Sequence, residues 1–488
     1  MFPVYANPSE LEKAAKEKYA VPQFLMMENA AKAMADFILE HCSGSVVIAC
    51  GKGNNGGDGY ALARLLQNKL EVTVLCIEEA AATEARVQYE MCARLGIKLL
   101  NADVKSDFTK FEKACKNASA IVDCIYGTGF RGTINENTAK IISIMNQSNG
   151  LKIACDISSG LAFNADYTIT MGEHKLSLFS DKAKSVSGQI LVKEIGLSSQ
   201  AFEAAGSKPQ AYLIDASDMQ LPVRNNKAAH KGTYGHTAVL CGDKAGAAIL
   251  AATAAMNFGS GLTSIIQTSG SNLSQFKISP SLMLSDSIPA KTTCVSFGSG
   301  FTNFPEQVAE NILKWFDKAA KPAAVIDAGI LTNPDFPAFL KKLNSHKEAR
   351  IVLTPHLSEL SRLLQNISGT DSSKDFSVSS LAENPESRLE AAKLLNSLFP
   401  KTAVIMKSAN TFIAAEKKVF IICDGAQCLA KGGSGDILAG LTAALLAQGY
   451  SAQTAAITAS EYHAILSQKF GKNSFTLTPE KLLKLINL

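Results

Sequence analysis

The chain has 488 residues, of which 47% are hydrophobic and 19% are charged, and its formal net charge is +4. Disorder requires low hydrophobicity and high net charge, so this composition predicts a folded protein of two or three domains. The small net charge, without a basic stripe of interleaved aromatic residues, argues against nucleic acid as a partner. The most apolar stretches are shorter than the ~20 residues of a membrane span, which argues against a membrane protein.

The 11 cysteines are scattered through the chain, and no two have the CxxC spacing of a zinc or redox site. Several lie inside apolar runs, such as Cys50 and Cys155, where a free thiol behaves as a small hydrophobic residue. We therefore expect no disulfide framework, a reducing compartment and a cytoplasmic location.

In the first part of the chain, short apolar runs alternate with helical stretches; these runs are residues 46–50, 72–77, 119–127 and 151–157. Continuous apolar strands separated by amphipathic helices are typical of a parallel sheet covered on both faces. We expect an α/β fold with an N-terminal Rossmann-like, doubly wound sheet. The region ends near residue 205, after a strand-like run at 188–197.

A second α/β series follows, with expected strands at 236–242, 292–300, 323–329, 351–355, 402–407 and 411–422 and a long helical region at the end. The sequence therefore predicts two domains, residues 1–210 and 211–488. The polar stretch 368–387 is rich in turn residues and is expected to be an exposed loop.

A glycine-rich segment, GKGNNGGDG at residues 51–59, directly follows the first predicted strand and opens a helix. Glycines allow close approach of the backbone to a ligand, and a helix N-terminus attracts anions. The segment contains the GxGxxG pattern of dinucleotide-binding folds, with Glu78 or Glu79 as a candidate ribose ligand. That pattern does not account for Asn54, Asn55 and Asp58.

Polar residues also follow three other strand ends: Asp123, Asp156 and Ser159. The carboxyl ends of parallel strands meet at one edge of a sheet, where ligands bind. Asn55, Asp123 and Ser159 carry hard oxygen donors, which favour a monovalent cation or Mg²⁺ over a transition metal.

These segments, together with residues 27–30, resemble the N-terminal domain of the NAD(P)H-hydrate epimerases. The resemblance implies a K⁺ site formed by Asn55, Asp123 and Ser159, and Asp156 as the proton-transfer residue. Ser158 stands where the family usually has proline. The substrate contacts implied are Asn54, Asn55, Gly56, Gly57, Asp58, Gly127, Thr128, Gly129, Phe130, Arg131, Gly132, Thr133 and Asp156.

In the second half, AKGGSGD at residues 430–436 immediately precedes an apolar helix. Three glycines and a serine at a helix N-terminus form an anion hole. Asp436 can then accept a proton from a hydroxyl group held beside that anion. The motif is similar to the GxGD signature of ribokinase-like kinases.

Most of residues 229–450 resembles, in order, the ADP-dependent (S)-NAD(P)H-hydrate dehydratase domain, which has a ribokinase-like fold. The resemblance implies a nucleotide site at Lys407, Ser408, Ala409, Asn410, Thr411, Ala426, Gln427, Cys428, Leu429, Ala430, Lys431, Gly432, Gly433, Ser434 and Gly435. It implies substrate contacts at Ala247, Gly300, Pro355, His356, Leu357, Ser358, Glu359, Leu360 and the catalytic Asp436.

Several positions depart from the dehydratase pattern. Leu357 and Ser358 replace a usual Pro-Gly pair, and Ser408 and Asn410 stand where glycines are usual. Lys431 replaces a usual threonine beside the anion hole, where it adds positive charge.

The two resemblances together predict a bifunctional enzyme that epimerises (R)- and (S)-NADHX and NADPHX and dehydrates the S epimer, converting ADP to AMP and phosphate. They imply K⁺ at the epimerase site, Mg²⁺ at the dehydratase site, ADP or ATP as co-substrate and a homo-oligomer. Two alternatives remain open at this stage. One is a ribokinase-type small-molecule kinase fused to a Rossmann dinucleotide-binding domain, and the other is a nucleotide-binding scaffold without turnover.

Overall fold

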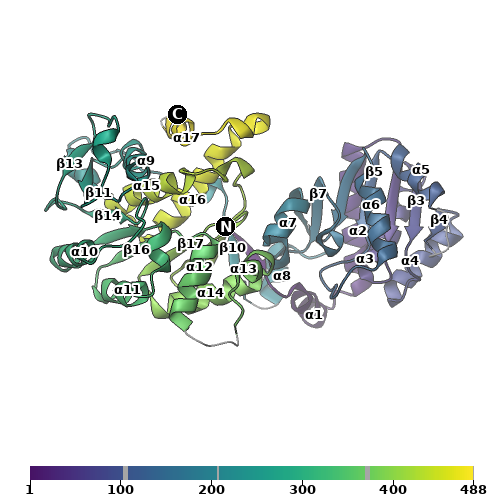
Figure 1. Ribbon diagram of the computed structural model, residues 1–488. Helices are drawn as coiled ribbons and strands as arrows, with labels where there is room; N and C mark the ends of the chain where they lie inside the picture. Colours follow the sequence, from purple (N-terminus) through teal and green to yellow (C-terminus); the bar gives the residue numbers. More distant parts are fainter. Residues whose placement is uncertain (103–107, 206–207, 369–373, 487–488) are drawn as a thin grey trace. The chain divides into compact units, whose positions relative to one another are not determined.

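The computed structural model describes residues 1–102, 108–205, 208–368 and 374–486. The chain divides into two units: an N-terminal unit, Pro3–Pro209, and a C-terminal unit, Gln210–Leu488, to which Met1–Phe2 also belong. Each has its own sheet with helices packed on both faces (Figure 1). Within the described residues, no helix is both long enough and apolar enough to cross a membrane.

The sheet of the N-terminal unit has seven parallel strands, in the order β4 (Lys98–Asn101), β3 (Glu71–Cys76), β2 (Ser45–Cys50), β5 (Ala120–Cys124), β6 (Leu151–Cys155), β7 (Tyr167–Met171) and β9 (Gln189–Lys193). Its helices are α1 (Pro8–Tyr19), α2 (Gln23–His41), α3 (Asn54–Leu66), α4 (Thr83–Arg94), α5 (Thr109–Asn117), α6 (Glu136–Asn146), α7 (Asp181–Val186) and α8 (Ser199–Ala205). A short strand, β1 (Phe2–Tyr5), pairs in parallel with β8 (His174–Lys175).

The central strand β2 shows why its sequence is apolar without interruption. Val46 and Ile48 belong to a core that also contains residues of α2 and α3, whereas Val47 and Ala49 belong to a second core with residues of α5 and α6. Successive side chains of a strand point to opposite faces, so a sheet covered on both faces requires apolar residues at every position. The predicted doubly wound sheet is confirmed.

The C-terminal unit has the strand order β13 (Met283–Ser285), β12 (Leu262–Gln267), β11 (His236–Cys241), β14 (Cys294–Phe297), β15 (Ala323–Ile326), β16 (Arg350–Leu353), β17 (Thr402–Met406), β18 (Thr411–Ala415), β19 (Lys418–Ile422) and β10 (Ala211–Leu213). Its helices are α9 (Ala245–Asn257), α10 (Glu306–Lys318), α11 (Phe336–Ser345), α12 (Leu357–Ser368), α13 (Val378–Glu383), α14 (Pro385–Leu398), α15 (Ser434–Ala447), α16 (Ala452–Gln468) and α17 (Pro479–Leu485).

Helix α15 is buried almost all round, which explains its lack of a polar face. A Cβ atom added at Gly440 would lie 2.2 Å from the carbonyl oxygen of Ala251, so α15 and α9 approach each other too closely for a larger residue. This packing fixes the N-terminus of α15, and with it Asp436, against the sheet.

Two expectations about this unit are corrected. Residues 411–422 are not one strand but an antiparallel hairpin, because Glu416 and Lys417 adopt positive φ angles and reverse the chain. The stretch 368–387 is not only a loop: α13 lies within it and buries Leu381, while residues 369–373 are outside the described part of the chain.

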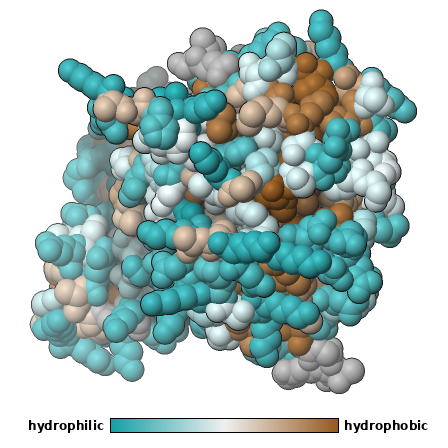
Figure 2. Space-filling model, turned by 90° about the vertical axis from the view of Figure 1, so that its left-hand side faces the viewer, coloured by the Kyte–Doolittle hydropathy of each residue, from teal (hydrophilic) through white to brown (hydrophobic). Residues whose placement is uncertain are grey.

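Figure 2 views the end of the C-terminal unit that carries β13 and α10, where apolar patches lie between hydrophilic side chains. On the edge strand β13, Met283 and Leu284 are exposed.

Candidate functional site

The glycine-rich segment forms a tight turn between β2 and α3. A Cβ atom at Gly56 would lie 1.9 Å from the carbonyl oxygen of Gly51, and one at Gly51 would lie 2.1 Å from that of Ile125. These two glycines are therefore required by the backbone packing of the turn itself. A Cβ atom at Gly53 would meet nothing within 4 Å, so that position faces open space.

A cavity of about 680 Å³, which we call the Asn55 cavity, opens beside this turn. The predicted substrate contacts that line it are Asn54, Asn55, Asp58, Gly127, Thr128, Gly129, Phe130, Arg131 and Asp156. Gly56, Gly57, Gly132 and Thr133 are not part of its lining. Gly57 instead packs against Met27, because a Cβ atom there would lie 2.4 Å from the methyl carbon of that side chain.

Asp156 lies on the wall of the Asn55 cavity and forms an ion pair with Lys175, a buried residue. Its carboxylate also accepts hydrogen bonds from the Thr170 hydroxyl at 3.2 Å and the Met171 amide at 3.3 Å. Asp156 has a φ angle of +70°, a strained conformation for a residue other than glycine. The backbone and three donors thus hold this carboxylate at one position.

Two more carboxyl groups, Glu12 and Asp58, line the same cavity. Burial raises the pKa of Asp58 well above its usual range, and the charges of Asp156 and Glu12 raise it further. Burial also raises the pKa of Glu12, partly offset by Lys175. Glu12 and Lys175 were not identified from the sequence, because each lies in an ordinary helical or strand pattern far along the chain from the glycine-rich turn.

The three residues expected to hold K⁺ lie at the same edge of the sheet, but only Asn55 lines the cavity. Asp123 is fully buried and accepts bonds from the Ser159 hydroxyl at 2.6 Å and the Ser159 amide at 2.8 Å. Burial raises the pKa of Asp123 to about 6, although these bonds and one from the Ile125 amide lower it. The buried Nδ2 atom of Asn55 has no hydrogen-bond partner.

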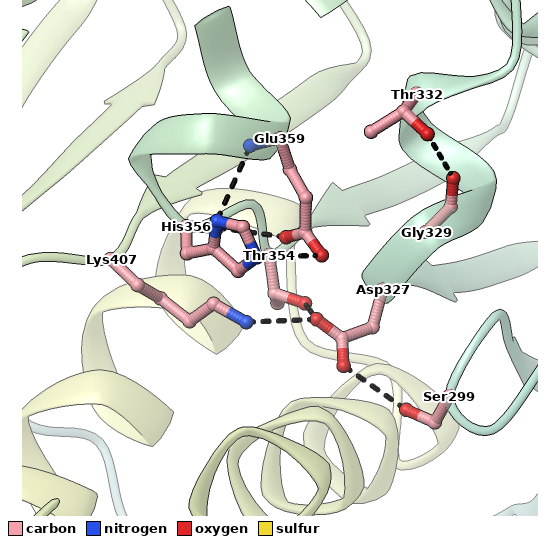
Figure 3. A network of polar contacts seen from close by, with 8 residues as sticks. All are labelled: Ser299, Asp327, Gly329, Thr332, Thr354, His356, Glu359 and Lys407. Carbon is pink, nitrogen blue, oxygen red and sulfur yellow. Dashed lines mark hydrogen bonds and ion pairs between the residues drawn. The ribbon is translucent and has the colours of Figure 1, made fainter. Parts of the chain in front are cut away.

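In the C-terminal unit, a network of polar contacts is centred on Asp327, which follows β15 (Figure 3). Its buried carboxylate accepts hydrogen bonds from the Lys407 ammonium at 2.9 Å, the Ser299 hydroxyl at 3.1 Å and the Thr354 hydroxyl. Burial raises the pKa of Asp327, but Lys407 and the hydrogen bonds outweigh it, so the pKa lies below the usual range. Asp327 is therefore a charged anchor for Lys407.

Asp436 lies in the first turn of α15, and Gly433 precedes this helix with a φ angle of +91°. A Cβ atom on Gly435 would lie 3.3 Å from the Lys407 ammonium, so Lys407 reaches the same helix N-terminus. Burial raises the pKa of Asp436, and the charge of Asp327 raises it further. An ammonium group, a helix N-terminus and a proton-accepting carboxylate are thus brought together.

His463, on α16, was not identified from the sequence. Its buried ring lies 3.2 Å from the Ser434 hydroxyl at the N-terminus of α15. Burial, together with the charge of Lys407, lowers the pKa of His463 to about 4, so the ring is neutral near pH 7. A neutral ring can fix the Ser434 hydroxyl without adding a charge.

The predicted substrate segment 355–360 turns into helix α12. The His356 amide donates to the Glu359 carboxylate at 2.9 Å, and His356 Nε2 lies 3.2 Å from the same carboxylate (Figure 3). Leu357 and Leu360 are buried, so their side chains pack into the unit and do not face a ligand. His356, whose side chain is more than half exposed, and Ser358, also exposed, are the side chains of this segment that a ligand can reach.

Arg388, on α14, was also missed from the sequence. It is fully buried, donates to the Asn410 carbonyl at 2.8 Å and lies over the Phe412 ring at 4.9 Å. It also donates to carbonyl groups of Leu381 and Ala382 in α13. Arg388 therefore ties the predicted nucleotide loop 407–411 to α13.

Comparisons with known proteins match a family to each unit. The family described as NAD(P)H-hydrate dehydratase matches residues 237–488, and the family described as YjeF-related protein N-terminus matches residues 24–177. The Bacillus subtilis ADP/ATP-dependent NAD(P)H-hydrate dehydratase, co-crystallised with ATP and Mg²⁺, is 25% identical. The similarity covers 55% of this chain and 92% of that one, with a TM-score of 0.45.

Two relatives match nearly the whole chain. The bifunctional NAD(P)H-hydrate repair enzyme Nnr of Helicobacter pylori is 34% identical, over 100% of this chain and 99% of the relative. The enzyme of the same name from Moorella thermoacetica is 30% identical, over 94% of this chain and 90% of the relative. With both family segments present in the expected order, the chain belongs to the bifunctional NAD(P)H-hydrate repair enzymes.

Proposed function

We propose that the N-terminal unit interconverts the R and S epimers of NADHX and NADPHX, and that the C-terminal unit dehydrates the S epimer to NAD(P)H with ADP as phosphoryl donor. The observation that carries the dehydratase assignment is the placement of Asp436 and Lys407 at the glycine-rich N-terminus of α15. Family membership supports the division of the two reactions between the units.

In the dehydratase, hydroxide is a poor leaving group until it is phosphorylated. Asp436 takes the proton of the C6 hydroxyl as its oxygen attacks the β-phosphorus of ADP, and AMP leaves. The C6–O bond then breaks and phosphate leaves with the bonding electrons. Loss of a proton from C5 to the departing phosphate restores the C5–C6 double bond of the nicotinamide ring. Lys407 and the amides before α15 stabilise the negative charge that develops on the phosphoryl oxygens.

Mg²⁺ at this site would neutralise phosphate charge. Among the described residues, no three His, Cys, Asp or Glu side chains lie close enough together to hold a metal. This fits an ion that takes most of its oxygens from the nucleotide and water. Use of ADP in preference to ATP is proposed from the family resemblance.

In the epimerase, inversion at C6 requires a proton acceptor and a proton donor beside a carbon that carries a labile hydroxyl. Asp156, held by Lys175 and Thr170, is the proposed acceptor. Asp58 and Glu12, whose pKa values burial raises, are the proposed donors on the same cavity.

A K⁺ ion fits the donor set of Asn55, Asp123 and Ser159, which are all hard oxygen ligands. The Nδ2 atom of Asn55, which has no hydrogen-bond partner, supports this site. Rotating the side-chain amide by 180° exchanges its nitrogen and its oxygen. Turning the amide would direct an oxygen to a cation. The ion would position anionic groups of the substrate near Asp156.

Replacing K⁺ by choline should slow epimerisation at least tenfold and leave dehydration of pure S epimer unchanged. Asn55→Ala should give the same loss in K⁺ buffer. Asn68→Gly, beyond the C-terminal end of α3 at a position with a φ angle of +62°, should not. Unchanged epimerisation in choline would remove the proposed ion.

The proposed function is tested by recovery of reduced-nicotinamide absorbance from purified (S)-NADHX with ADP, with ATP and with neither. We expect recovery that depends on a nucleotide, and recovery from the R epimer as well when the N-terminal unit is intact. A stable phosphorylated product would favour the small-molecule kinase. Homo-oligomerisation and a cytoplasmic location stay predictions, the former testable by light scattering.

A further inference from the structure

A second cavity, of about 930 Å³, lies in the N-terminal unit beyond the site described above. We call it the Tyr89 cavity. It opens at the carboxyl ends of β3 and β4, the two strands at one edge of the sheet (Figure 1). Its walls are completed by the first two turns of α4 and the first turn of α6. Two of its lining residues, Glu78 and Glu79, are the candidate ribose ligands of the dinucleotide-binding pattern, and the proposed chemistry does not use the cavity.

The Tyr89 cavity continues from the Asn55 cavity. Glu78 and Asn135 line both. Glu78 forms a 2.9 Å ion pair with Lys52 of the glycine-rich turn. The amides of Ala81 and Ala82, in the loop after β3, donate to the Lys52 carbonyl at 2.9 and 3.2 Å. The turn and the floor of the second cavity are therefore tied together at the point where the two cavities meet.

The lining of the Tyr89 cavity combines an aromatic wall with acidic groups. Tyr89 is half-buried and packs edge to face on Tyr60, with ring centroids 5.4 Å apart. Such a fixed ring offers a surface for stacking a nucleobase. The charged residues of the lining are Glu78, Glu79, Glu90, Glu136 and Arg86. Lys52 pairs with Glu78 at 2.9 Å and Arg94 with Glu90 at 3.8 Å, so the lining remains acidic chiefly through Glu79 and Glu136.

We propose that the Tyr89 cavity binds the adenosine half of the hydrated dinucleotide and makes the epimerase site select NADHX over NADPHX. This inference rests on the proposed epimerase function. Carboxylates after the second strand of a dinucleotide-binding unit accept hydrogen bonds from the 2′-hydroxyl of the ribose. A 2′-phosphate would bring about two further negative charges into this acidic lining, beside Glu79 and Glu136, and be repelled.

The test uses the full chain carrying Asp436→Asn, so that the S epimer accumulates. Epimerisation of (R)-NADHX and (R)-NADPHX is followed by chromatography at equal ionic strength. We expect kcat/KM to favour NADHX about tenfold, and the preference to shrink as salt screens the charges. The double change Glu79→Gln with Glu90→Gln should bring the kcat/KM values of the two substrates to within about threefold of each other. Glu112→Gln, at an exposed position of α5, should not.

A truncated substrate shows whether a change at Tyr89 acts on binding of the adenosine half or on folding of the N-terminal unit. Tyr89→Ala should raise KM for both dinucleotides about tenfold, as loss of base stacking does, with kcat little changed. Epimerisation of hydrated nicotinamide mononucleotide, which lacks the adenosine half, should be unaffected by the same change. Equal rates for the two dinucleotides, or slower turnover of the mononucleotide by Tyr89→Ala, would overturn the inference and leave the epimerase function standing. Absence of epimerisation with every substrate would overturn the proposed function and this inference together.

Discussion

The two units each contain a buried aspartate paired with a lysine, but the pairs serve different purposes. In the N-terminal unit, Lys175 bonds to Asp156, which itself lines the Asn55 cavity. In the C-terminal unit, Lys407 bonds to Asp327, and the reactive Asp436 is a third group whose pKa burial raises. A lysine can therefore either hold the acting carboxylate in place or be held, by another carboxylate, for use on a substrate.

The largest expected effect concerns Asp436, the reactive carboxylate, since Lys407 forms its ion pair with Asp327. Asp436→Asn should lower the dehydration rate about 10²–10⁴-fold, the usual range for loss of a general base. Nucleotide binding and epimerisation should be retained. Asp317→Asn, exposed on α10, is the matched control. Single-turnover rates with ADP and a calorimetric ADP titration check both statements. Loss of ADP binding instead would make Asp436 a structural residue and break the comparison.

The second-largest expected effect concerns Lys175, which forms an ion pair with Asp156. Lys175→Met should slow epimerisation about 100-fold and destabilise the N-terminal unit by about 3–5 kcal/mol, because it leaves a buried charge unpaired. Adding Asp156→Asn should restore stability, since no unpaired charge then remains, but not activity. Lys182→Met, exposed on α7, is the control. Thermal unfolding and epimerisation assays measure the two quantities; recovery of activity in the double variant would exclude Asp156 as the proton acceptor.

The smallest expected effect concerns His463 and the pH dependence of the stability of the C-terminal unit. The pKa of His463 is about 4 in the folded chain, below its ordinary 6.5, so the unfolded chain binds more protons between these values. The contribution of a neutral His463 to the free energy of unfolding is therefore fully present above pH 6.5. It decreases as the pH drops toward 4, by about 2 kcal/mol at pH 5.

Melting temperatures between pH 7 and pH 5 test this, because His463→Asn should flatten the loss whereas His346→Asn, half-buried on the edge of α11, should not. An unchanged slope in His463→Asn would mean that folding does not lower the pKa of the ring, which would then carry a charge beside the Ser434 hydroxyl at pH 5.

Much of the fold follows from local patterns. Alternating runs of apolar strands and helices predict two parallel sheets, and the glycine-rich segments predict the two turns that open α3 and α15. The hairpin at 411–422 could not be read in this way, because a reversal at Glu416 and Lys417 carries no glycine or proline. Helix α13 was missed because serine dominates its surroundings. Burial of Leu381 and the hydrogen bonds from Arg388 make it part of the unit.

The sequence by itself determined the family, the two glycine-rich turns and the aspartates that the chemistry needs, because those residues stand together in short motifs. Only the tertiary structure decided which aspartate meets which lysine. It also placed Glu12, Lys175, His463 and Arg388 at the sites, and it joined the Tyr89 cavity to the Asn55 cavity. The physical reason is that ion pairing, burial and pKa depend on distances between residues far apart in the chain, and local sequence patterns do not encode those distances.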